Sequence, residues 1–126
     1  MSKILVDTDI LIDYLRGYPP SVEFLESQSF PLLISSITIA ELYAGVKKGK
    51  ENEILDNFIG TFEIIPPDTK IAQKGGLFRR DFKKSHGVGL ADALIAATAK
   101  EQGVSLVTLN RKHFPMLKNI LTPYVK

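Results

Sequence analysis

Short apolar runs alternate along the chain with longer segments in which apolar residues recur every three or four positions. The runs predict buried strands at residues 3–6, 30–35, 63–65 and 105–109, with a last short strand near Leu121 or Tyr124. The segments with helical spacing are residues 10–15, 21–28, 38–48, 51–62, 68–84 and 90–102. Because strands and helices alternate from end to end, we expect an α/β fold. This is a three-layer α/β/α sandwich with a mostly parallel central sheet.

Glycine, proline and capping residues mark the expected helix ends. Gly17 and the pair Pro19-Pro20 should end the first helix, and Asp68 is suited to cap the helix that runs towards Lys84. Residues 85–89 predict a loop, Gly103 fits a helix C-cap, and residues 112–117 predict a short turn or helix. We find no repeat or linker, so residues 1–126 should form a single domain.

Composition narrows the possible classes of protein. Hydrophobic residues make up 44% of the 126 residues, which is enough for a packed core. The absence of cysteine excludes a disulfide scaffold, a thiolate zinc site and a cysteine nucleophile. No apolar run approaches the ~20 residues of a membrane span, and the first residues do not resemble a signal peptide. A cytoplasmic protein without membrane association is therefore expected.

Positive charge is concentrated in one predicted helix, although the net charge is only +2. Residues 70–84 carry six cationic side chains against Asp81 alone: Lys70, Lys74, Arg79, Arg80, Lys83 and Lys84. Such a face could bind a polyanion. A solvated helix surface explains the same run equally well.

Polar side chains follow the predicted strands at the points where these end. Asp7, Thr8 and Asp9 follow the first strand. Ser35, Ser36 and Thr38, and then Glu41, follow the second, and Thr108 and Asn110 come at the end of the fourth. Asp92 lies in the first turn of the helix that precedes it. Ligands of parallel sheets bind at the carboxyl ends of strands. Oxygen donors gathered there favour Mg²⁺ or Mn²⁺, because a cation offsets the repulsion between carboxylates.

Each of these residues also has a purely structural interpretation. Asp7 or Asp9 could cap the first helix, and Thr38-Ile39-Ala40-Glu41 matches a capping box. Asp92 could be a first-turn acid favoured by the helix dipole. We expect Asp13 to be a surface acid near Arg16, and His86 and His113 to be loop residues rather than metal ligands.

Four segments, taken in order, resemble the PIN-domain family and in particular its VapC-like toxins. They are residues 4–13 (ILVDTDILID), 34–42 (ISSITIAEL), 90–97 (LADALIAA) and 106–114 (LVTLNRKHF). The resemblance implies a divalent-metal-dependent endoribonuclease that uses Mg²⁺ or Mn²⁺ to activate water against an RNA phosphodiester. It also implies a homodimer, and a cognate antitoxin that inhibits the enzyme and alone connects it to operator DNA.

The resemblance also assigns roles to residues. Asp7, Glu41 and Asp92 correspond to the metal-binding acids, and Asn110 takes a fourth catalytic position that is often Asp. Thr8, Asp9, Ser36 and Thr108 would support the site. Phosphates would be bound by cationic side chains, namely Arg79, Arg80, Lys83, Lys84, Arg111 and Lys112. Because Asn110 brings no charge, one ion should bind well and a second only weakly.

Three other functions fit parts of the pattern. A PIN-like domain without activity could bind only RNA or an antitoxin, and the neutral Asn110 gives this alternative some support. A phosphatase of the haloacid dehalogenase type also has Asp-x-Asp after its first strand, but it requires a later Gly-Asp pair that this chain lacks. DNA flap nucleases use similar acids in much longer chains.

Overall fold

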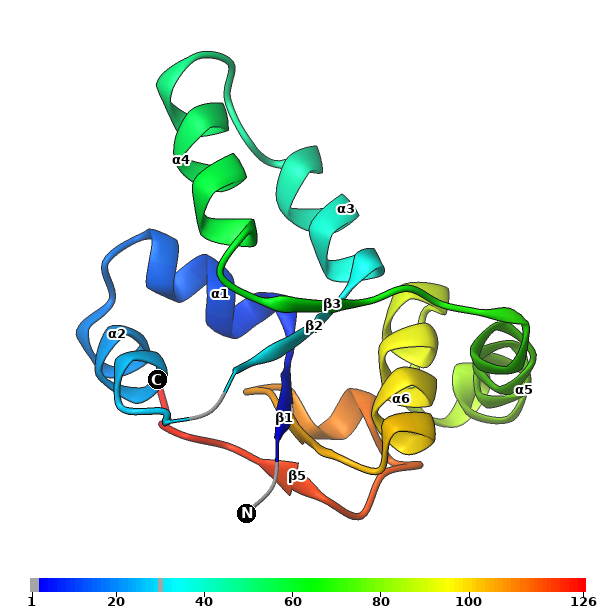
Figure 1. Cartoon of the computed structure of the whole chain (residues 1–126). Helices are drawn as coiled ribbons and strands as arrows, with labels where there is room; N and C mark the ends of the chain where they lie inside the picture. The colour runs from blue at the N-terminus through cyan, green and yellow to red at the C-terminus, as the bar shows by residue number, and fades with distance from the viewer. Residues whose placement is uncertain (1–2, 30) are drawn as a thin grey trace.

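The computed structural model describes residues 3–29 and 31–126, and within them five strands form one parallel sheet. The strands are β1 (Ile4–Val6), β2 (Leu33–Ser35), β3 (Glu63–Ile65), β4 (Ser105–Val107) and β5 (Ile120–Leu121). Their order is β3-β2-β1-β4-β5, and every pairing is parallel (Figure 1). The predicted start of the second strand at Phe30 lies outside the described residues.

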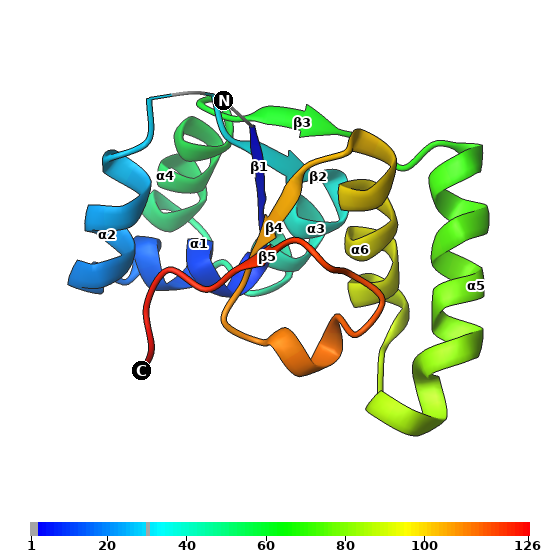
Figure 2. The same cartoon turned by 90° about the horizontal axis from the view of Figure 1, so that it is seen from below.

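Helices cover both faces of the sheet, which confirms the predicted α/β/α fold (Figures 1 and 2). One layer contains α1 (Thr8–Leu15), α2 (Pro19–Glu26), α3 (Ser36–Ala44) and α4 (Lys50–Ile59). The other contains α5 (Thr69–His86) and α6 (Leu90–Gln102). Successive strand residues point to opposite faces. Val6 therefore packs in the core under α1–α4, and Leu5 in the core under α6.

Several helix boundaries differ from the prediction for identifiable reasons. Pro19 begins α2 instead of only ending α1, because its fixed φ suits the first helical position. Helix α3 starts at Ser36, capped by the hydroxyl of Ser35, and ends at Ala44 rather than at 48. The predicted 85–89 loop is wrong at its start, because α5 continues to His86 and ends where Gly87 adopts φ 63°.

The acid expected at the surface is instead buried beneath the C-terminal tail. Asp13 is only 3% exposed, so its predicted surface position is wrong. Its carboxylate accepts hydrogen bonds from Tyr124 Oη at 2.7 Å and Lys126 Nζ at 2.6 Å. Partners 111 and 113 residues away in sequence therefore compensate the charge, and they attach the tail to α1.

The chain reverses its direction of travel across the sheet between β1 and β4. From β1 it proceeds to β2 and β3 on one side, and it then returns through α5 and α6 to β4 and β5 on the other. Such a reversal opens a crevice at the carboxyl ends of the two central strands. Asp7 follows β1 and Thr108 follows β4, so both lie at this point. Among the described residues, no helix is long and apolar enough to cross a membrane.

Candidate metal centre at the carboxyl edge of the sheet

Asp7 is the central acid of this edge. It caps α1, with Oδ1 accepting a hydrogen bond from the Thr8 backbone amide at 2.8 Å, while Oδ2 accepts one from Thr108 Oγ1 at 2.7 Å. The side chain is 6% exposed. The pKa of Asp7 is raised to about 7, mainly by burial and also by repulsion from Asp9 and Asp92, while the two hydrogen bonds oppose the shift. The capping role expected as an alternative is therefore present, but it does not neutralise this acid.

Asp9 joins the start of α1 to the end of β4. Its Oδ1 accepts from the Ile10 amide at 2.8 Å, and its Oδ2 accepts from the Leu109 amide at 2.9 Å. Thr108 Oγ1 also lies 3.3 Å from Oδ2, so one buried hydroxyl contacts both acids. Burial raises the pKa of Asp9, and the backbone hydrogen bonds oppose that shift. These contacts join Asp9 and Thr108 to each other beside Asp7, and their supporting role stays a prediction.

Glu41 connects to Asp7 through Thr8, whose hydroxyl contacts Glu41 and whose backbone amide donates to Asp7. Thr8 Oγ1 donates to Glu41 Oε1 at 2.6 Å and lies 3.1 Å from Thr38 Oγ1. Thr38 is fully buried as the third residue of α3, whose N-cap is Ser35, so the capping box that starts at Thr38 is wrong. Its hydroxyl instead lies beside that of Thr8 at the carboxyl edge of the sheet. Ser36 starts α3, but Ser35 supplies the capping hydroxyl.

Asp92 approaches the same edge from the first turn of α6. Burial raises its pKa, the neighbouring His113 opposes that shift, and the charge of Asp92 contributes to the raised pKa of Asp7. Asp92 Oδ2 lies 3.2 Å from His113 Nδ1, and that nitrogen lies 2.7 Å from Asn110 Nδ2. The Asn110 backbone amide donates to Thr108 Oγ1 at 3.1 Å. His113, predicted to be an uninvolved loop residue, therefore contacts two candidate site residues.

The donor chemistry of this edge suits a hard divalent cation. Three carboxyl groups with raised pKa values, those of Asp7, Asp9 and Asp92, lie at this edge, and a bound cation would stabilise their ionised forms. Within residues 3–29 and 31–126, however, no three His, Asp or Glu side chains form a ready set of metal ligands. The described residues thus offer the oxygen ligands and the negative charge that such an ion prefers. Their side chains are not yet arranged as a complete coordination sphere.

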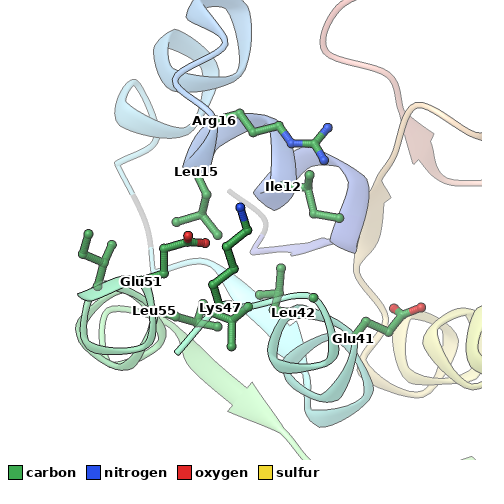
Figure 3. Close-up of a pocket in the computed structure, with 11 residues that line it drawn as sticks. Ile12, Leu15, Arg16, Glu41, Leu42, Lys47, Glu51 and Leu55 are labelled. Carbon is green, nitrogen blue, oxygen red and sulfur yellow. The ribbon is translucent and has the colours of Figure 1, made fainter. Parts of the chain in front are cut away.

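An apolar groove borders the crevice between α1, α3 and α4. It has a volume of about 490 Å³ and is lined by side chains that include Leu15, Leu42, Ile54 and Leu55. Leu15 and Ile54 are exposed apolar residues. Glu41 stands at one end of the groove, with its carboxylate pointing away from the apolar lining (Figure 3).

Residues 4–118 match the PIN domain, which is nearly the whole chain. The chain belongs to the PIN-domain family. It is 39% identical over 124 residues to Ribonuclease VapC10 of Mycobacterium tuberculosis, covering 96% of this chain and 92% of that protein. This confirms the predicted resemblance, and it decides against a haloacid dehalogenase phosphatase.

Solved PIN-domain structures share the arrangement as well as the sequence. A toxin-antitoxin complex from Klebsiella pneumoniae superposes with a TM-score of 0.86 and 32% identity, covering 98% of this chain and 100% of that one. A DNA-bound VapBC from Salmonella typhimurium gives a TM-score of 0.79 and 29% identity, covering 95% and 96% of the two chains. The three-layer fold of this chain is therefore the PIN fold of toxins in such complexes.

Proposed function

We propose that this PIN-domain protein is a divalent-metal-dependent endoribonuclease and the toxin of a toxin–antitoxin pair. The observation that carries the proposal is the convergence of Asp7, Asp92 and the Thr8-linked Glu41 on the carboxyl edge of the sheet. The name of the ribonuclease relative and the matching toxin-antitoxin complex support the same activity and partner class. A cytoplasmic location is part of this proposal.

Asp7, Asp92 and Glu41 are the residues that would hold Mg²⁺ or Mn²⁺. When bound, such an ion activates water and neutralises the charge that develops on the phosphate. Thr108 orients Asp7 by donating to Oδ2, and Asp9 fixes the β4 end against α1. Glu41 is exposed, and its Oε1 accepts a hydrogen bond from the Thr8 hydroxyl. We assign Glu41 as the general base that accepts a proton from the attacking water.

Cleavage of a mixed RNA pool tests the activity. The purified protein should cleave RNA with Mg²⁺ or Mn²⁺ and leave it intact in EDTA, and DNA of the same sequence should stay uncut. Mass spectrometry of the sample checks that no antitoxin has co-purified. Metal-independent cleavage would contradict the proposed metal centre. No cleavage by antitoxin-free protein on total cellular RNA would favour the alternative of an inactive binding domain.

The carboxyl end of α5 is the better placed part of the basic helix for binding RNA. Figure 2 shows this end beside the start of α6, at the same end of the molecule as the turn that follows β4. Exposed Lys83 and Lys84 belong to it, whereas Lys70 lies at the opposite end of the helix. Arg79, Arg80, Arg111 and Lys112 are further candidates; Arg80 pairs with Asp81, and Arg111 contacts the Ile120 carbonyl.

Charge removal at the two ends of α5 should affect RNA binding differently. In a cleavage-deficient Asp7→Asn background, Lys83→Ala/Lys84→Ala should reduce the slope of log affinity against log salt by about 1.4, from ~0.7 per lost phosphate contact. Lys70→Ala/Lys74→Ala removes the same charge and is the matched control. Equal slopes for both double variants would mean that the α5 charges are only a solvated surface.

The apolar groove is the proposed seat of the antitoxin. Its lining of Leu15, Leu42 and Ile54 suits the apolar face of a bound segment, and Glu41 at its end gives that segment access to the acids. Blocking of the acidic edge by the segment would explain inhibition. A homodimer, the other proposed assembly, is checked by light scattering across concentrations.

A further inference from the structure

One turn of 3₁₀ helix fixes the place of a histidine beside the candidate metal centre. Helix η1 (Arg111–His113) follows β4, and in a 3₁₀ helix residues three apart lie above one another. The His113 amide donates to the Asn110 carbonyl at 3.1 Å, and Phe114, only 1% exposed, anchors the turn in the core. The imidazole is therefore held next to the Asn110 side chain by the backbone, not by chance contact at the surface.

The nitrogen Nδ1 of His113 faces two groups with opposite requirements. It lies 2.7 Å from Asn110 Nδ2, an amide donor, and 3.2 Å from Asp92 Oδ2, a carboxylate acceptor. A neutral imidazole carries its proton on only one nitrogen, so Nδ1 either accepts from the amide or donates to the acid. The shorter contact is to Asn110, and it requires Nδ1 without a proton. The ring proton is then on Nε2.

We propose that His113 is a positioning residue that sets the orientation of the Asn110 amide. By accepting from Nδ2, the imidazole fixes the rotation of the amide, so that Oδ1 is the end that does not face the ring. A divalent cation binds an amide oxygen and is repelled by an amide NH₂ group. The consequence for activity rests on the proposed function.

Nuclear magnetic resonance of the metal-free protein tests the hydrogen bond itself. The chain has two histidines, so the spectrum of a His113→Gln variant assigns the two rings. Long-range ¹⁵N–¹H correlations at mildly alkaline pH should show His113 with its proton on Nε2. Asn110→Asp should move that proton to Nδ1, where it can donate to a carboxylate. A proton on Nδ1 in the wild type, or no change in Asn110→Asp, would overturn the proposal.

Metal affinity and kinetics test whether the bond matters to the site. His113→Leu removes the acceptor at similar volume and should weaken Mn²⁺ binding by calorimetry ~10–100-fold, the usual effect of losing a group that orients ligands. His113→Gln offers an amide oxygen to Asn110 and should restore most of the affinity. The same pattern should appear in kcat for RNA cleavage, with KM for RNA nearly unchanged.

The outcomes separate this inference from the proposed function. His113→Leu could bind Mn²⁺ as tightly as the wild type, or the Leu and Gln variants could lose equal amounts of Mn²⁺ affinity. Either result would show that His113 only packs the turn. If the wild-type protein cleaves no RNA, the proposed function fails. The position of the His113 proton is still measurable then, and a proton on Nε2 would still support the hydrogen bond.

Discussion

Asp7→Asn should make the metal-free protein more stable at neutral and alkaline pH. The folded state raises the pKa of Asp7 from 3.8 to about 7, so between these values the folded chain binds more protons than the unfolded chain. The free energy of unfolding therefore falls as pH rises through this window. Each pKa unit corresponds to 1.36 kcal/mol, so the variant should gain on the order of 2–4 kcal/mol near pH 8 and almost nothing near pH 4.

Urea denaturation in EDTA at several pH values measures this gain. The amide can still accept from the Thr8 backbone and pair with the Thr108 hydroxyl, so the cap of α1 is retained. Asp68→Asn is the matched control, because Asp68 is an exposed cap that accepts from the Ile71 amide. A stability gain in Asp7→Asn that is independent of pH, or an equally large gain in Asp68→Asn, would contradict the prediction. The ionised Asp7 carboxylate would then not destabilise the folded state.

Gly75→Ala should destabilise the protein, whereas the neighbouring Gly76→Ala should not. A Cβ at Gly75 would lie 2.7 Å from Leu94 Cδ2 and 3.2 Å from Leu94 Cα, where α5 packs against α6. The side chain of Leu94 can rotate, but its backbone cannot withdraw without moving the helix that carries Asp92. At Gly76 nothing lies within 4 Å of the added carbon.

The two glycine variants are controls for each other. Both replace Gly by Ala inside the same helix, which alone should add about 1 kcal/mol of stability. Only Gly75→Ala also overpacks an interface, at a cost of ~1–3 kcal/mol. Chemical denaturation should therefore place Gly75→Ala below Gly76→Ala by about that cost. Equal stabilities would mean that the close approach of α5 and α6 is not required.

The fold could be predicted because strong local signals agreed with the long-range order. Asp68 and Gly103 cap their helices as expected, and the apolar runs became strands of one parallel sheet. The errors lie where two local solutions differ little in energy. Ser35, not Thr38, caps α3, because either hydroxyl could do so and only packing decides that Thr38 is buried.

The candidate site was predictable to the extent that it follows strand ends. Asp7 and Thr108 meet because parallel strands end at one edge, a rule that needs no side-chain detail. Asp13 and His113 were misjudged because their partners come from tertiary contacts. Asp13 is neutralised by the C-terminal tail, and His113 contacts Asp92 from another element. No sequence spacing signals the first of these, whereas the three-residue step from Asn110 to His113 could have signalled a shared turn.

The central claim is that the acids at this edge make the PIN domain a metal-dependent ribonuclease, and one assay tests it most directly. Wild-type protein and Asp7→Asn are incubated with the same labelled RNA in Mn²⁺, after denaturation has shown that the variant is folded. We predict cleavage by the wild type and none above background by the variant, a loss that unfolding cannot explain. Equal cleavage by both proteins would contradict the account, because the RNA would then be cut without the acid on which the site is centred.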